Sequence, residues 1–297
     1  GQDGAVTGLI VAMLARGHVL LEGVPGVAKT LLVRSLSAAL QLDTKRVQFT
    51  PDLMPGDVTG SMIYEGGRGE FVFREGPVFT NILLADEINR TPPKTQSALL
   101  EAMQERSVTF AGQTHPLPRP FFVLATQNPI EQAGTYPLPE AQLDRFLLRI
   151  DVGYPTEEEE VQMVSRTTHA GLDDAQPAMD VDTLLRLQKL VRDIEIGEPM
   201  LRYATRLVRA TRPNESTVDA VKKHIGWGAG PRAGQALVLA SKARALMQGR
   251  LAVTRDDIGA MLLPVLAHRV LRNFEAEADG IAIADVLQSL RNEIKVD

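Results

Sequence analysis

The chain has 297 residues, a formal net charge of −5 and no cysteine. This length is enough for two domains with separate hydrophobic cores, and the absence of cysteine excludes disulfides and thiolate chemistry. No apolar run reaches the roughly 18 residues of a membrane span, and the first residues do not resemble a secretory signal. We therefore expect a cytoplasmic protein. No basic face is evident, which makes nucleic acid an unlikely main partner.

The first strong pattern in the chain is a strand, a glycine-rich turn and a helix. An amphipathic helix ends near Arg16, and the apolar run 18–21 then predicts a buried strand. The turn that follows resembles a phosphate-binding loop, in which backbone N–H groups and a helix N-terminus face phosphate oxygens. The expected nucleotide contacts are Gly23, Val24, Pro25, Gly26, Val27, Ala28, Lys29, Thr30 and Leu31. The alternative is a chance glycine-rich turn.

Within this turn, Lys29 is expected to reach the β- and γ-phosphates, and the Thr30 hydroxyl to ligate Mg²⁺. The usual pattern has glycine where this chain has Ala28. That position opens the following helix, where a residue confined to negative φ is tolerated. The five histidines show no metal-ligand spacing. ATP and a Mg²⁺ ion carried with it are therefore the expected cofactors.

Further buried strands alternate with helices along the next hundred residues. Strands are predicted at 45–50, 82–85, 121–125 and 146–152, and helices after Pro93 and up to Leu143. Short apolar pieces around glycine-rich turns predict two hairpins, one within 51–80 and one within 107–117. Continuous apolar strands between helices are typical of an α/β fold with a parallel sheet covered on both faces.

Polar residues follow two of these strands directly. Asp86 and Glu87 come after the strand at 82–85, at the edge where open α/β sheets bind ligands. Asp86 is expected to help hold Mg²⁺, and Glu87 to orient and polarise an attacking water. An acidic helix N-terminus is the alternative. Asn128 follows another strand and could hold the γ-phosphate or the water, although Asn before Pro is also an ordinary turn residue.

The pattern changes at 153–155. Later segments have helical periodicity, for example 181–192, 201–211, 233–247 and 256–266. We therefore predict an α/β nucleotide-binding domain over residues 1–155 and a helical domain over 156–297. Arg202, Arg206 and Arg209 share one helix face near Arg212. They form either a solvated face or a contact with a neighbouring subunit or an acidic client.

Several segments together resemble the MoxR family of AAA+ ATPases. They are 22–30, 49–55, 86–90 and 125–129, followed by Asp144-Arg145-Phe146 and Gly230-Pro231-Arg232. The resemblance covers essentially the whole chain. It implies a P-loop NTPase of AAA+ type with a three-layer parallel sheet. The two hairpins would be the helix-2 insert and the pre-sensor-1 hairpin, and residues 156–297 a small all-helical lid.

The same resemblance implies roles for individual residues. Lys29 and Thr30 would belong to Walker A, Asp86 and Glu87 to Walker B, and Asn128 to sensor 1. Arg232 would be the sensor 2 arginine that reaches the γ-phosphate from the lid. Arg145 would be an arginine finger that enters the neighbouring subunit's site. Arg149 is the second choice for that role, and Arg145 could instead form a salt bridge with Asp144 or Glu140.

The expected function is Mg-dependent hydrolysis of ATP to ADP and phosphate by a chaperone-like motor that remodels or matures protein complexes. The resemblance implies a homo-oligomeric ring, usually a hexamer, together with a von Willebrand factor A domain partner and a protein client. Two alternatives stay open. One is a nucleic-acid-dependent motor, and the other is a nucleotide-gated binding module with little turnover.

Overall fold

The computed structural model describes residues 3–23, 29–67, 69–127, 134–168 and 175–296. The chain separates into two compact units. Unit 1 contains His18–Arg145 and Ile150–Leu185 together with the start of the chain. Unit 2 contains Gly8–Gly17, Phe146–Arg149 and Arg186–Asp297. The described residues include no helix long and apolar enough to cross a membrane.

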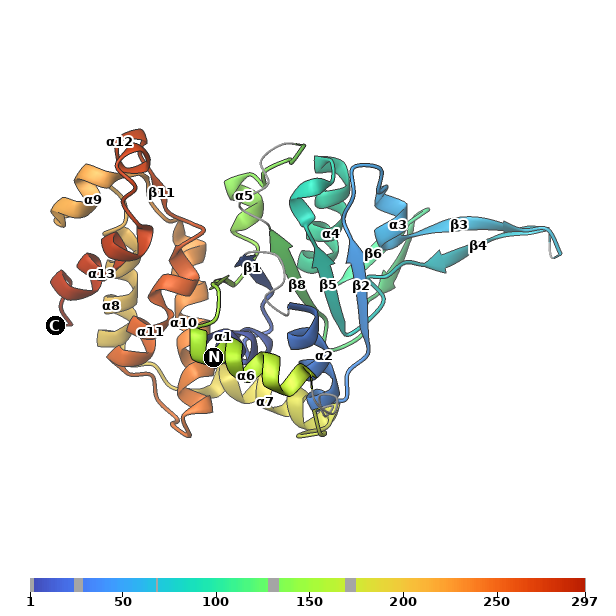
Figure 1. Ribbon diagram of the computed structural model, residues 1–297, viewed down its shortest axis with the longest axis horizontal. Helices are drawn as coiled ribbons and strands as arrows, with labels where there is room; N and C mark the ends of the chain where they lie inside the picture. Colours follow the sequence, from blue (N-terminus) through green and yellow to red (C-terminus); the bar gives the residue numbers. More distant parts are fainter. Residues whose placement is uncertain (1–2, 24–28, 68, 128–133, 169–174, 297) are drawn as a thin grey trace. The chain divides into compact units, whose positions relative to one another are not determined.

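Unit 1 is built on a five-stranded sheet with the strand order β2-β5-β8-β1-β9 (Figure 1). The strands are β1 (Val19–Gly23), β2 (Thr44–Gln48), β5 (Ile82–Asp86), β8 (Phe122–Gln127) and β9 (Leu148–Val152). β5 pairs in parallel with β2 on one side and β8 on the other, and β8 pairs in parallel with β1. The apolar residues of the inner strands β1, β5 and β8 are almost completely buried, as the continuous apolar runs predict.

Helices connect the parallel strands. α2 (Lys29–Leu40) leads from β1 to β2, and α4 (Pro93–Glu105) leads from the short η1 (Ile88–Arg90) toward β8. α3 (Pro55–Thr59), α5 (Glu140–Leu143) and α6 (Glu157–Thr168) also lie in this unit. The alternation confirms the predicted α/β fold. The segment after α6 also packs on unit 1, because the N–H groups of Ala178 and Met179 both donate to the Ala39 carbonyl at the end of α2.

Two antiparallel hairpins extend from unit 1, as predicted. β3 (Gly60–Glu65) pairs with β4 (Glu70–Glu75) in the arm that projects from the sheet in Figure 1. β6 (Ser107–Phe110) pairs with β7 (Gln113–Pro116). The rings connect the two hairpins, since Phe73 of the first lies 5.9 Å from Phe110 and 4.3 Å from His115 of the second. Phe71, by contrast, is 65% exposed. Within the described chain its ring contacts one other aromatic ring, that of Tyr64 on the paired strand.

Unit 2 is mainly helical. Its helices include α8 (Glu198–Arg209), α9 (Asp219–His224), α10 (Pro231–Met247), α11 (Arg255–Leu266), α12 (Phe274–Ala278) and α13 (Ile283–Glu293), and α7 (Val181–Asp193) begins in unit 1 and continues into unit 2. α1 (Asp3–Leu14) is divided in the same way. The lid is not helical throughout, because β10 (Ile225–Trp227) forms a short antiparallel pair with β11 (Leu271–Arg272). Strands of three and two residues are too short for alternation to reveal.

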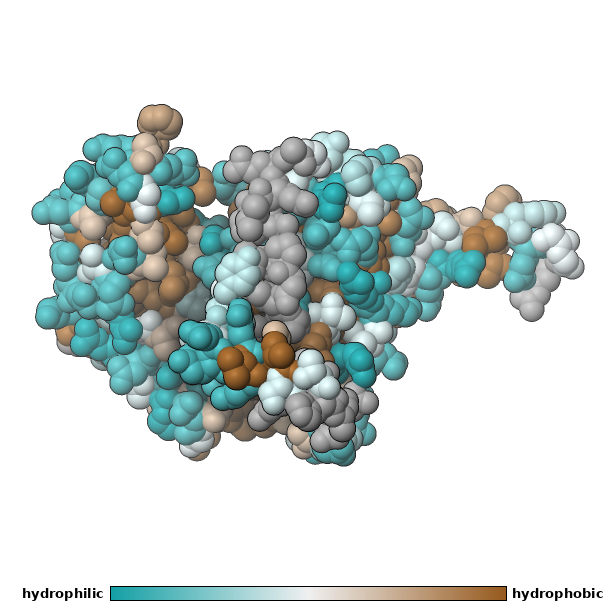
Figure 2. Space-filling view, viewed as in Figure 1, coloured by the Kyte–Doolittle hydropathy of each residue, from teal (hydrophilic) through white to brown (hydrophobic). Residues whose placement is uncertain are grey.

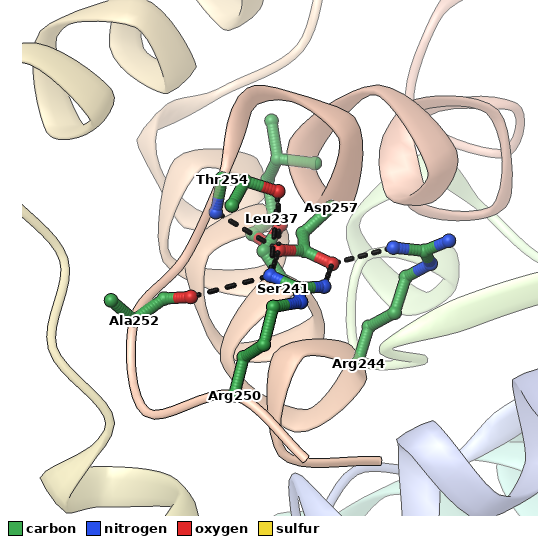
Figure 3. A network of polar contacts seen from close by, with 7 residues as sticks. All are labelled: Leu237, Ser241, Arg244, Arg250, Ala252, Thr254 and Asp257. Carbon is green, nitrogen blue, oxygen red and sulfur yellow. Dashed lines mark hydrogen bonds and ion pairs between the residues drawn. The ribbon is translucent and has the colours of Figure 1, made fainter. Parts of the chain in front are cut away.

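A buried carboxylate joins α10 to α11 in this lid. Asp257 is completely buried and receives two hydrogen bonds of 2.6 Å from Arg250, with further bonds from Arg244 and Thr254 (Figure 3). Burial opposes ionisation, but the hydrogen bonds from Arg250, Thr254 and Arg244 outweigh it and lower the pKa of Asp257. Thr254 and Asp257 also form the capping box that begins α11.

Candidate nucleotide site

The predicted phosphate-binding turn lies between β1 and α2. Residues 24–28, which form its centre, lie outside the described part of the chain. At its edges, the Lys29 Nζ donates a hydrogen bond of 2.7 Å to the Gly23 carbonyl. Thr30 and Leu31 are exposed in the first turn of α2. A Cβ atom on Gly23 would collide with the carbonyl oxygen of Val152, so glycine is required where β1 passes close to β9.

The two acidic residues are held from the neighbouring strand. Because Ala85 pairs with Ala125, Asp86 at the end of β5 lies beside Thr126 of β8. The buried Thr126 hydroxyl donates to Asp86 Oδ1 at 2.6 Å and accepts the N–H of Glu87 at 2.8 Å. One hydroxyl group therefore fixes the side chain of the first acidic residue and the backbone of the second.

Glu87 has a left-handed backbone with φ 56° and ψ 50°, a conformation that costs a residue with a side chain about 1 kcal/mol. Its carboxylate Oε2 accepts hydrogen bonds from Gln48 at 2.6 Å and from Arg90 at 3.0 Å. Asp86 Oδ2 pairs with Arg46 of β2 at 2.6 Å. Both carboxylates thus have fixed positions at the carboxyl edge of the sheet.

Lys29 lies at the same edge, because its Nζ is hydrogen-bonded to Gly23 at the carboxyl end of β1, and β1, β8 and β5 run parallel. Burial lowers its pKa, and the nearby charges of Asp86, Glu87 and Glu22 oppose that shift. The ammonium group and two carboxylates therefore belong to one site. A fixed cation with adjacent carboxylates at the carboxyl end of a parallel sheet is an arrangement that binds a phosphate group and a divalent cation.

The donor set also fits Mg²⁺. The described residues contain no cluster of three or more His, Cys, Asp or Glu side chains that would hold an ion alone. Mg²⁺ typically takes one or two protein oxygens and completes its octahedron with water and phosphate oxygens. Asp86, together with the exposed Thr30 hydroxyl, offers ligands of that type.

Comparisons with known proteins agree with this geometry. The family model of ATPases associated with various cellular activities (AAA) matches residues 18–148, and the AAA lid domain model matches residues 218–290. Chaperone MoxR1 of Mycobacterium tuberculosis is 47% identical over 95% of this chain and 75% of its own length. The chain belongs to the MoxR family of AAA+ ATPases.

Other known proteins are also similar to this chain. Protein MoxR of Methylorubrum extorquens is 31% identical over 91% of this chain and 83% of its own length. The uncharacterized protein YeaC of Bacillus subtilis is 45% identical over 97% of this chain and 88% of its own. A crystal structure of a candidate ATPase from Cytophaga hutchinsonii superposes with a TM-score of 0.93 and 42% identity, covering all of this chain and 91% of the other. The similarity confirms the AAA+ fold with its lid.

Four further residues were predicted for the nucleotide site of this MoxR-family chain. Asn128 lies outside the described residues. Arg145 is half-buried just after α5. Arg149 lies in β9, whereas Arg232 is exposed in the first turn of α10 and belongs to unit 2. The roles proposed for these four residues stay predictions.

The residue after Arg145 is held firmly within unit 2. The Phe146 carbonyl accepts hydrogen bonds from the buried Arg269 at 2.6 Å and from His268 at 3.1 Å, and Arg269 also reaches the Leu147 carbonyl at 3.1 Å. Burial, opposed by the bond to Phe146, lowers the pKa of His268 well below its usual value and keeps the ring neutral. The peptide on one side of the predicted finger therefore has a fixed position.

Sequence reasoning missed the residues that hold the two carboxylates. Gln48 and Arg46 lie in no motif, and Thr126 and Arg90 fall within the matching segments 125–129 and 86–90 without a role being predicted for them. Thr126 was identifiable in principle, because it ends the strand beside β5, and the carboxyl ends of parallel strands meet at one edge. Gln48 faces Asp86 in the register of β2 with β5, and that register becomes known only from the structure.

Proposed function

We propose that this MoxR-family chain binds Mg-ATP, hydrolyses it to ADP and phosphate, and uses the cycle to remodel or mature protein complexes. The observation that carries the proposal is the hydroxyl of Thr126, which holds Asp86 and Glu87 together beside Lys29. The name of the relative Chaperone MoxR1 supports a chaperone-like role.

In this proposal, different residues would bind the phosphates and activate the attacking water. Lys29 would bind the β- and γ-phosphate oxygens, and its proximity to two carboxylates favours the ammonium form that this needs. Glu87 would orient the attacking water and accept its proton, and Gln48 and Arg90 fix the position of its carboxylate. Asn128 would hold the γ-phosphate or the water. These groups act on charge and position, which is the main requirement of phosphoryl transfer.

Thr30 and Asp86 would hold the Mg²⁺ ion, directly or through water. When bound, the ion would neutralise the charge that develops on the phosphate oxygens. Both oxygens of Asp86 already accept a hydrogen bond, Oδ1 from Thr126 and Oδ2 from Arg46. Because a carboxylate oxygen has two lone pairs, each can still accept from a metal-bound water.

We further propose that the chain assembles in the cytoplasm into a homo-oligomeric ring, with a hexamer as the expected size. Arg145, or Arg149 in its place, would enter the site of the next subunit, and Arg232 would contact the γ-phosphate from the lid. A finger supplied in trans makes hydrolysis depend on assembly. A partner with a von Willebrand factor A domain and a protein client belong to the same proposal, which rests on membership of the family.

The test compares Glu87→Gln with Glu101→Gln, an identical change at an exposed position of α4. The first variant should bind ATP as tightly as wild type and lose turnover, because an amide does not accept the water's proton. The second should retain both. Normal turnover in Glu87→Gln would remove Glu87 from the mechanism. Tight ATP binding without turnover in the wild-type assembly would favour a nucleotide-gated module, and stimulation by DNA at low salt would favour a nucleic-acid motor.

A further inference from the structure

Unit 2 contains a large groove between α8 and α10, next to the end of α7. Its volume is about 980 Å³, which accommodates several side chains. Apolar residues form much of its wall, among them Leu201 and Val208 from α8 and Val238 and Leu239 from α10. Leu201 is 40% exposed. The groove therefore offers apolar surface whose burial by a partner would be favourable.

Four basic residues border the same groove. They are Arg192, Arg209, Arg212 and Lys242, and none of the described lining residues is acidic. Glu215, which is outside the lining, pairs with Arg209 at 2.9 Å and with Arg212 at 3.1 Å. Because Glu215 pairs with only two of the four basic residues, the described border of the groove has an excess of positive charge. The partner that fits combines apolar side chains with carboxylates.

The chain itself contains a segment of this kind. α6 begins with four consecutive glutamates, Glu157 to Glu160, and continues with Val161, Met163 and Val164, which are 64%, 48% and 53% exposed. In a helix Glu157, Glu160, Val161 and Val164 share one face, because they follow the spacing i, i+3, i+4 and i+7. Figure 2 shows brown side chains next to teal ones over α6. Such a stripe of exposed apolar residues marks an interaction surface.

We propose that α6 of a second copy of this chain docks in the groove between α8 and α10. α8 lines the groove from Leu201 to Arg209, which spans ~12 Å along its axis, and Arg212 lies beyond its end. The twelve residues of α6 span ~18 Å, so α6 is long enough to cover this wall and reach Arg212. Val161 and Val164 pack against the apolar wall, and Glu157 and Glu160 face the basic border. For the surface that contains Arg209 and Arg212, the sequence left open a neighbouring subunit, an acidic client or a solvated face. In this proposal the surface is a subunit contact.

This contact joins two different surfaces, so it is heterologous and repeats from copy to copy. A closed ring results when the rotation closes, and an open filament when it does not. The inference thus rests on the proposed ring and assigns a specific contact to it. ATP hydrolysis is a separate property, so the two proposals are tested by different measurements.

The experiment reverses the charges on each side. One variant carries Arg192→Glu and Arg209→Glu in the groove, and the other carries Glu157→Lys and Glu160→Lys in α6; all four side chains are exposed. Sedimentation velocity at matched nucleotide concentration measures the mass against protein concentration. Each variant alone should associate at least tenfold more weakly than wild type. Matched controls are Lys222→Glu with Lys223→Glu in α9, and Glu275→Lys with Glu277→Lys in α12, which are exposed positions outside the groove.

Mixing the two variants gives the decisive result. Each groove then meets an α6 of opposite charge, so the mixture should regain association in alternating assemblies, and misfolded variants would not recover. Association of either variant at wild-type strength, or no recovery in the mixture, would overturn the docking. A wild-type ring with ATP turnover but unaffected by the substitutions would leave the proposed function intact and refute only this contact. A wild type that stays monomeric would refute both the contact and the ring.

Discussion

Thr126→Val tests whether one hydroxyl organises the proposed catalytic edge. Valine has nearly the shape of threonine, so the substitution removes two hydrogen bonds and leaves no cavity. The bond to Asp86 involves a charged acceptor and contributes about 1.5–3 kcal/mol, and the bond from the Glu87 N–H contributes about 0.5–1.5 kcal/mol. Because Thr126 is 1% exposed, water does not readily replace the hydroxyl. Unfolding of unit 1 should therefore cost about 2–4 kcal/mol less in the variant.

Thr126→Val should also lower ATP turnover, because the hydroxyl fixes the position of Glu87. Without its partner the left-handed Glu87 backbone is free to relax, and a displacement of about 1 Å at a reacting group is enough to reduce turnover about 100-fold. We expect Thr126→Val to lose at least tenfold in ATP turnover and Thr126→Ser, which keeps the hydroxyl, to stay within about threefold of wild type. Urea denaturation and a phosphate-release assay measure the two effects. Wild-type turnover in Thr126→Val would refute the role given to this hydroxyl.

Three further predictions concern the framework. Burial lowers the pKa of His18 from 6.5 to about 4 in the folded chain. As the pH falls, the unfolded chain therefore binds a proton at a higher pH than the folded chain does. The stability that is present above pH 6.5 is lost as the pH falls toward 4. Wild type should lose about 3 kcal/mol more than His18→Gln over this window in urea titrations, and parallel curves would contradict the assignment. Asp257→Asn should destabilise the lid by about 3 kcal/mol, because it removes the buried carboxylate that pairs with the half-buried Arg244 and Arg250. An unchanged lid transition in hydrogen exchange would refute this. Gly23→Ala forces a Cβ atom against Val152, so it should lower the free energy of unfolding by about 1–3 kcal/mol and abolish ATP binding. The control Gly153→Ala has open space around its Cβ and should change neither property. Equal ATP affinity in the two variants would contradict the steric argument.

The neutral state of His18 has a direct geometric cause. Its Nδ1 accepts the N–H of Val123 at 3.0 Å, and its Nε2 lies 3.2 Å from the Met103 carbonyl, so the tautomer with hydrogen on Nε2 satisfies both groups. A second proton would oppose the Val123 N–H. The ring thus connects the start of β1 to β8 and to α4, and it does so only when uncharged.

Much of the fold was predictable because its signals are local. The strands β1, β5 and β8 are buried on both faces, so nearly every residue in them is apolar and the strand is visible as a continuous apolar run. The second hairpin and the long helices α7 and α10 are equally visible from turns and periodicity. The β10–β11 pair was not predicted, because it depends on contacts between Trp227 and Leu271, which are far apart in the sequence.

The part of the site that could be predicted from the sequence is the part formed by short runs of consecutive residues. Lys29 and the Asp86-Glu87 pair occur in recognisable local patterns, and the structure brings them to one edge of the sheet. Their supports are different, because Thr126, Gln48 and Arg46 reach the carboxylates from neighbouring strands through the sheet register. No short motif encodes that register. The groove near Arg209 was likewise only partly visible, since half of its lining comes from α10.

The arginine finger can be tested by mixing subunits. Arg145→Ala should lose turnover and regain part of it when combined with Lys29→Ala subunits, because each kind supplies what the other lacks. The same mixture made with Arg149→Ala distinguishes the two candidate fingers. Absence of recovery for both, in mixtures shown by mass to contain joint assemblies, would contradict a finger acting in trans.

The central claim is that this chain hydrolyses ATP at a site completed between subunits. The most direct test is Mg-ATP turnover per subunit measured against protein concentration, with the mass of the assembly determined on the same samples. Our account predicts that turnover rises together with the formation of a ring-sized species. Turnover per subunit that is independent of concentration, or negligible turnover in a ring that binds ATP, would contradict it.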